Sequence, residues 1–130
     1  MLLAIAITYV LVSGSQTIIN GPNVSMDFAL AKRDLYGSDF LWFRKDGREY
    51  VIHDAATLDR VNAMFERARA LKTEMKKLKW EMRSPNQRES VRQRQEEIER
   101  ERDALEADAE RRMVPILDEA IRSGVATRTR

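Results

Sequence analysis

The stretch FLWFRKDGREYVIH, residues 40–53, indicates more clearly than any other part of the sequence how this chain folds. Two runs rich in aromatic and β-branched residues flank Asp46-Gly47, and Asp-Gly is a strong signal for a two-residue type I′ turn. We therefore predict a β-hairpin. Its turn sets the register, which pairs Leu41 with Ile52, Trp42 with Val51, Phe43 with Tyr50 and Arg44 with Glu49.

Both faces of this predicted hairpin carry apolar side chains, because successive residues of a strand point to opposite faces. We expect the face with Leu41, Phe43, Tyr50 and Ile52 to pack on a short helix or on the base of longer helices. A partner protein on the other face would explain its aromatic residues, although for Trp42 itself core packing is favoured over a partner contact. The candidate partner surface comprises Phe40, Trp42 and Val51, with Trp80 further along the chain.

The sequence before the hairpin is almost uncharged, since residues 1–31 contain a single charge, at Asp27. Leu2 to Val12 is nearly all apolar. A signal-peptide core is one interpretation, but no Lys or Arg precedes the run. A membrane helix would need about 20 apolar residues. The β-branched residues favour a buried strand, with a Ser-Gly-Ser turn and a second short strand at residues 16–19.

A short helix is expected between this pair of strands and the hairpin. Ser25 can cap a helix that runs to about Leu35, and Asp27 lies near its positive end. Gly37 is suited to the left-handed conformation that ends a helix. The residues spaced for one inward face are Met26, Ala29, Leu30 and Arg33.

Two long helices are predicted after Asp54, which is a plausible N-cap. Apolar residues recur at gaps of three or four, close to a heptad repeat. The Ser84-Pro85 pair separates the two helices, and Pro115 should kink or restart the second one. The predicted helix seam comprises Leu58, Val61, Phe65, Leu71, Met75, Leu78, Val91, Ile98, Leu105 and Ile116.

The charges of these helices lie in two opposed blocks. Residues 60–94 hold 11 Lys and Arg against 4 Glu, or +7, whereas residues 95–121 hold 4 Arg against 10 Asp and Glu, or −6. The blocks favour an antiparallel hairpin whose halves attract each other, and pairing between two chains is the alternative. Binding of a nucleic-acid phosphate backbone along residues 60–94 is less favoured, because the acidic helix would neutralise the positive field.

The sequence offers little chemistry for catalysis. The absence of Cys excludes disulfides and Cys-ligated zinc, and the only His, His53, is expected to be a structural residue at a strand end. No GxGxxG, Walker A, GxSxG or HExxH motif is present. We therefore expect no enzyme activity, no cofactor, no metal and no small-molecule substrate.

The order of motifs resembles a bacterial domain of uncharacterised function. The motifs are YVLVSG at residues 9–14, DFLWFRKDGREYVIHDAATL at residues 39–58 and ILDEAIRSGVA at residues 116–126. The domain occurs alone or at the C-terminus of membrane zinc peptidases of the beta-lactam-sensor type. The resemblance implies an extracytoplasmic or membrane-tethered module, with a membrane protein as one possible partner, and no catalysis, because the peptidase motif is missing. Its Leu-Gly-x-x-Gln repeats are altered here, with Arg92, Glu99 and Glu106 in place of Gly.

Together these patterns predict an α+β protein. A small antiparallel sheet of about four strands with one helix is expected at residues 1–53, a long helical hairpin with coiled-coil-like heptads at residues 54–124, and a basic tail at residues 125–130. The expected function is that of a non-enzymatic protein interaction or oligomerisation module of a bacterial envelope system, forming a homo-oligomer. Nucleic-acid binding through residues 60–94 and regulation of a membrane-bound peptidase are the alternatives.

Overall fold

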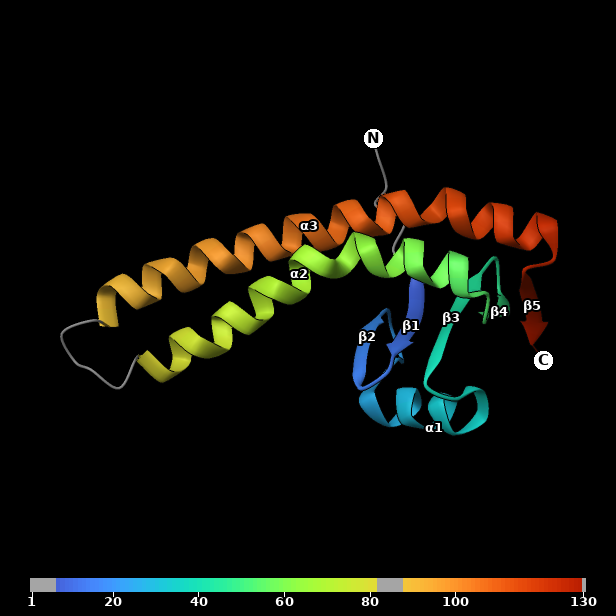
Figure 1. The fold of residues 1–130 in the computed structure, drawn as a ribbon, viewed down its shortest axis with the longest axis horizontal. Coiled ribbons are helices and arrows are strands. Elements are labelled where there is room, and N and C mark those ends of the chain that lie inside the picture. The colour runs from blue at the N-terminus through green and yellow to red at the C-terminus, as the bar shows by residue number, and fades with distance from the viewer. Residues whose placement is uncertain (1–6, 82–87, 130) are drawn as a thin grey trace. The chain divides into compact units, whose positions relative to one another are not determined.

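The computed structural model describes residues 7–81 and 88–129, and it confirms the predicted α+β class (Figure 1). The described chain forms two compact units. The first, the sheet unit, contains the residues up to Asn62 and from Met113 onward, and the second, the hairpin unit, runs from Ala63 to Arg112. The elements are β1 (Thr8–Ser13), β2 (Gln16–Asn20), α1 (Met26–Tyr36), β3 (Asp39–Lys45), β4 (Arg48–Ile52), α2 (Ala55–Glu81), α3 (Arg88–Ser123) and β5 (Ala126–Thr129).

The sheet unit contains one antiparallel sheet with the strand order β2-β1-β3-β4-β5. The predicted β-hairpin is confirmed in its register, because Trp42 lies opposite Val51 and Phe43 lies opposite Tyr50. Both turn residues have positive φ angles, 53° at Asp46 and 74° at Gly47, as a type I′ turn requires.

The sheet has five strands rather than about four, because the predicted basic tail forms β5. Ala126 lies opposite Ile52 and is buried, so the segment belongs to the fold. The prediction of a basic tail at residues 125–130 was wrong. It gave more weight to the arginines than to Thr127 and Thr129, which are β-branched and favour a strand. Pairing with β4 also satisfies backbone groups that would otherwise lie at the edge of the sheet.

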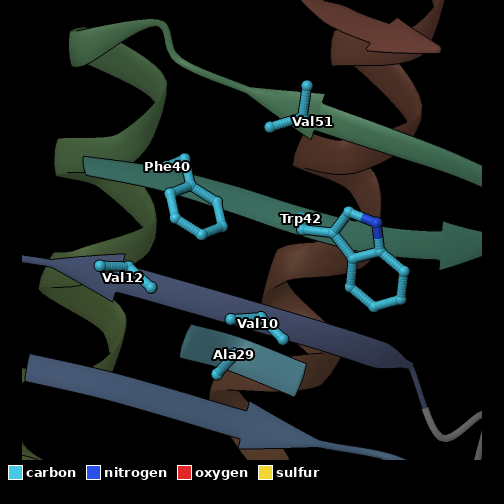
Figure 2. Packing of buried hydrophobic residues seen from close by; sticks show 6 residues of the cluster. All are labelled: Val10, Val12, Ala29, Phe40, Trp42 and Val51. Carbon is cyan, nitrogen blue, oxygen red and sulfur yellow. The ribbon is translucent and has the colours of Figure 1, made fainter. Parts of the chain in front are cut away.

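Both faces of the sheet are covered. On one face, α1 packs over a cluster whose side chains come from β1, β3 and β4 (Figure 2). Figure 2 also shows the start of α2 and the end of α3 behind the sheet, on the side opposite this cluster. The face with Leu41, Phe43, Tyr50 and Ile52 is therefore turned toward the long helices and away from α1, and all four side chains are buried.

The caps of α1 are as predicted, but its orientation is not. The Phe28 backbone N–H donates to Ser25 Oγ at 3.2 Å, and Gly37, with a φ of 93°, donates to the Arg33 carbonyl. Ala29 faces inward, whereas Met26 and Leu30 are exposed, so the predicted inward face was wrong in these two residues. The reason is aromatic packing, in which the rings of α1 turn toward the sheet. Ring centroids lie 5.0 Å apart for Phe28 and Trp42, and 5.4 Å apart for Tyr36 and Phe40.

The hairpin unit consists of the remaining parts of α2 and α3, which pack together as the predicted helical hairpin. Leu71, Met75 and Ile98 form its buried cluster, and the half-buried Leu78 and Leu105 pack against them. The predicted turn at Ser84-Pro85 lies outside the described residues. The coiled-coil geometry of the heptads stays a prediction.

The second long helix continues through Pro115 without the restart that was one of the two predicted outcomes. Proline has no N–H to donate to the carbonyl four residues earlier, so one helical hydrogen bond is missing. Met113 and Leu117 flank the proline and are buried. Their packing in the sheet unit offsets the lost bond, which is how tertiary contacts override local propensity.

Candidate interaction surfaces

The predicted partner surface on the sheet lies in the protein core. Phe40 and Trp42 are fully buried and Val51 is 5% exposed, so these three residues cannot contact a partner in this structure. Figure 2 shows them on one face of the sheet, beside Val10 and Val12 of β1 and Ala29 of α1. The assignment was wrong because the short helix, and not a partner, covers this face.

Trp42 is the centre of this core and is bordered by cations. The Lys32 ammonium lies 5.5 Å from its ring centroid, and the Arg44 guanidinium lies 5.6 Å from it. Both distances are within the range of cation–π attraction. The buried Trp42 Nε1 has no hydrogen-bond partner among the described residues, which lowers the net gain from burying this ring.

Helix α1 carries exposed apolar residues, and two of them, Met26 and Leu30, were predicted to face inward. Met26 is 53% exposed, Leu30 52% and Leu35 71%. Trp80 and Val125 are the other large apolar side chains that are exposed in the described residues. Three of these five exposed side chains therefore lie on one helix of 11 residues.

Strand β2 forms one edge of the sheet and pairs only with β1 in the described structure. Its sequence, QTIIN, contains neither a charge nor a proline. Ile18 and Ile19 are half-buried, whereas their partners on β1, Leu11 and Val10, are fully buried. The sequence pattern predicted this short strand, but which strands form the edges depends on the strand order.

A shallow, open depression of about 450 Å³ lies between the turn of the β-hairpin and the end of α3. Three cations and two carboxylates border it, namely Lys45, Arg48, Arg122, Asp46 and Asp118. The Lys45 ammonium and the Asp118 carboxylate form an ion pair, which neutralises part of this positive charge. Among the described residues, no group of three or more His, Asp or Glu side chains is arranged to hold a metal ion.

Two ion pairs join α2 and α3 inside the hairpin unit. Arg67 Nη2 of the basic block lies 3.3 Å from Glu101 Oε1 of the acidic block, whereas Arg94 Nη2 and Glu74 Oε1, 2.8 Å apart, both belong to the basic block. Hydrogen bonds to Glu74 and then to Glu97 raise the pKa of Arg94. Burial lowers the pKa of Arg69, and the nearby Glu66 opposes this shift. The Arg67–Glu101 pair is consistent with the predicted attraction between the two blocks.

The predicted seam residues are buried or half-buried within the chain, and so they leave no continuous apolar stripe for another helix. In contrast, Trp80 is 67% exposed near the end of α2. Lys76, Lys77 and Lys79 precede it, are exposed and form no ion pair in the part of the chain that the structure describes. Of the four predicted partner residues, Trp80 alone lies at the surface.

The remaining sequence-predicted residues have structural surroundings. His53 follows β4, and its ring lies edge-on to Tyr36 with the centroids 5.9 Å apart. Asp54 caps α2, because the Thr57 backbone N–H donates to Asp54 Oδ2 at 3.0 Å and the Thr57 hydroxyl donates to it at 2.6 Å. These two bonds lower the pKa of Asp54.

The chain matches no protein-family model, no curated protein and no solved structure. Its resemblance to the bacterial peptidase-associated domain therefore stays a prediction. None of the helices in residues 7–81 and 88–129 is both long and apolar enough to cross a membrane. Function is consequently inferred from the surfaces described above.

Proposed function

We propose that the protein is a non-enzymatic interaction and oligomerisation module that associates through the outer side of α1. The observation that carries this proposal is the exposure of Met26 and Leu30, which lie four residues apart on one side of a short helix. The inner side of the same helix is already packed by Phe28, Ala29 and Tyr36. Met26 and Leu30 therefore form a second apolar patch on α1, beside the exposed Asp27 and Asp34, and a partner would cover this patch.

Apolar contact through α1 predicts association that resists salt. Burying apolar side chains is favourable at any ionic strength, whereas attraction between exposed charges is screened beyond about 8 Å at physiological salt. The basic and acidic blocks are already joined by a cross-helix ion pair within one chain, at Arg67–Glu101. They are consequently less suited than α1 to join two chains.

Sedimentation equilibrium at low and high salt tests the proposal. We expect a species heavier than the 15.1 kDa monomer at tens of micromolar, persisting at high salt. The double variant Met26→Ser/Leu30→Ser should shift it to the monomer, whereas the matched variant Lys76→Ser/Lys77→Ser should not. A wild-type chain that is monomeric at both salt concentrations contradicts the proposal. Dissociation at high salt would instead indicate pairing of the charge blocks between chains.

A second candidate function is weak nucleic-acid binding at the end of α2. The observation that favours it is the group of exposed lysines, Lys76, Lys77 and Lys79, next to the exposed Trp80. Cations attract a phosphate backbone, and an exposed aromatic ring can stack on an unpaired base. The acidic residues of α3 limit this field, so the affinity should be low.

Trp80 fluorescence reports on this second function, because the other tryptophan, Trp42, is buried. Titration with a single-stranded oligonucleotide should quench the emission at about 50 mM salt and lose this effect at about 200 mM. Trp80→Phe should remove the quenching and leave the Trp42 signal. The absence of quenching at low salt would eliminate nucleic-acid binding here.

A further inference from the structure

The two edges of the sheet are not equally protected. β5 is four residues long and carries Arg128, whereas β2 is five residues long and uncharged. Proteins usually protect sheet edges with charges, prolines, bulges or covering segments, because an open edge offers backbone groups to another strand. The sequence of β2 has none of the protecting residues. Among the residues that the structure describes, β2 is therefore the edge that is open to pairing.

In the described structure, no further strand lies beyond β2 to cover its side chains. Ile18 lies opposite Leu11 and Ile19 lies opposite Val10, so the two isoleucines point to opposite faces of the sheet. Each is half-buried where its partner on β1 is fully buried. One strand added beyond β2 would cover both isoleucines at once, which neither a helix nor a loop on a single face could do.

We propose that a second copy of this chain supplies that strand, by antiparallel pairing of two β2 strands about a two-fold axis at Ile18. The inference rests on the proposed association function and specifies its partner. A two-fold interface must be self-complementary, so a charged residue at the axis would face its own charge. β2 meets this requirement. The register would pair Ile18 with the second copy's Ile18, Thr17 with its Ile19 and Gln16 with its Asn20.

The exposed residues of α1 support the same dimer independently. α1 packs against β2 as well as β3, and it lies near the β2 side of the sheet in Figure 1. A two-fold axis perpendicular to the sheet keeps both copies of α1 on the same face of the joined sheet, on either side of the axis. Met26 and Leu30 are four residues apart, so they form one apolar side of the helix that can be covered there.

Charge also favours a second copy at this surface. Residues 1–31, which include β1, β2 and the first half of α1, carry only Asp27. Two such surfaces can approach each other without the repulsion that their basic or acidic helices would cause. β2 itself offers no charge to a partner of opposite charge, whereas a neutral, self-complementary strand pair fits it.

Two substitutions at Ile18 test the proposal, each with a matched change on the other edge. In sedimentation equilibrium, Ile18→Lys should weaken the dimer about 100-fold, because like charges then meet at the axis and two apolar contacts are lost. Thr127→Lys on β5 should leave the dimer unchanged. Leu30→Glu, at a site that is 52% exposed, should weaken the dimer as well. Circular dichroism controls for folding of each variant.

Disulfide capture gives a second measurement, since the natural chain contains no Cys. Opposed residues of paired strands have Cβ atoms about 4.5–5.5 Å apart, close to the spacing of a disulfide. Mild oxidation should therefore cross-link Ile18→Cys into a covalent dimer much faster than Thr127→Cys. An oligomer that persists in Ile18→Lys, together with equal cross-linking of the two Cys variants, would overturn the β2 dimer and leave the proposed association function standing. A monomeric wild-type chain would overturn both.

Discussion

The sheet unit and the hairpin unit are stabilised by different interactions. The sheet unit buries large aromatic side chains on both faces of its sheet, and helices cover both faces. In the described part of the hairpin unit, Leu71, Met75 and Ile98 form a small buried cluster, and the helices are joined by exposed ion pairs such as Arg67–Glu101. Exposed ion pairs contribute little, at about 0–1 kcal/mol each.

This difference indicates which unit sets the stability of the chain and which unit carries its charge. Apolar burial contributes about 25 cal/mol for each Å² removed from water, so the aromatic core of the sheet unit dominates. The described cluster of the hairpin unit contains no aromatic ring. We therefore expect the sheet unit to open rarely and the hairpin unit to open more often, and three measurements can test that expectation.

The largest effect is predicted for Trp42→Ala in the core of the sheet unit. The side chain is fully buried and contacts Phe28 of α1, so its loss leaves a cavity between helix and sheet. Large aromatic truncations of this kind cost about 4 kcal/mol in the free energy of unfolding. Denaturant unfolding measures the loss. Hydrogen exchange should accelerate in β1 and β3.

Leu35→Ala is the matched control for this variant, because Leu35 is also a large apolar residue but is 71% exposed. Its truncation should change the free energy of unfolding by less than about 0.5 kcal/mol. If the hairpin unit exchanges as fast as the sheet unit in Trp42→Ala, the two units unfold together. The proposed difference between them would then be wrong.

A smaller effect, confined to the hairpin unit, is predicted for Ile98→Ala. Ile98 is fully buried against Leu71 and Met75, and the cluster is too small to rearrange around the cavity. The local cost should be about 3 kcal/mol. Hydrogen exchange should accelerate at residues 71–78 and remain slow in β1 and β3. Glu99→Ala, at the exposed neighbouring position, should leave both regions unchanged.

The sequence predicted local structure well where one residue type has one physical role. Asp46-Gly47 set the register of the β-hairpin, and Ser25 and Asp54 begin the helices that they were expected to cap. The seam of α2 and α3 followed from its spacing. Each of these features depends on residues that are close together in the chain or that repeat at a regular interval.

The errors concern what covers a surface, which depends on residues far away in the sequence. Alternation showed that Trp42 and Phe43 point to opposite faces, but it could not show that α1 covers one of them. The orientation of α1 was set by ring packing at Tyr36 and Phe40, and helical spacing alone favoured Met26 and Leu30. The candidate surfaces on α1 and β2 therefore became visible only with the tertiary structure.

The smallest predicted effect is the pH dependence that Asp54 adds at the start of α2 in the sheet unit. Hydrogen bonds from Thr57 lower the pKa of Asp54 in the folded chain. A carboxyl group whose folded pKa is depressed stabilises the fold above its unfolded pKa, and this contribution is lost as pH falls through the folded value. Asp54 should therefore contribute fully near neutral pH, and the contribution should decline as the pH falls below about 4 and through the lowered folded pKa.

Asp54→Asn separates this titration from the cap itself, because Asn is also a good N-cap but does not ionise. We expect the Tm of the wild-type chain to fall more than that of Asp54→Asn between pH 6 and pH 3, by a few degrees. Thr57→Val should reduce the same difference, because it removes the hydroxyl that donates to Asp54 Oδ2. Equal pH profiles for the wild-type chain and Asp54→Asn would show that the Thr57 contacts do not stabilise the ionised carboxylate. The start of α2 would then depend on the apolar packing of the sheet unit, as the rest of that unit does.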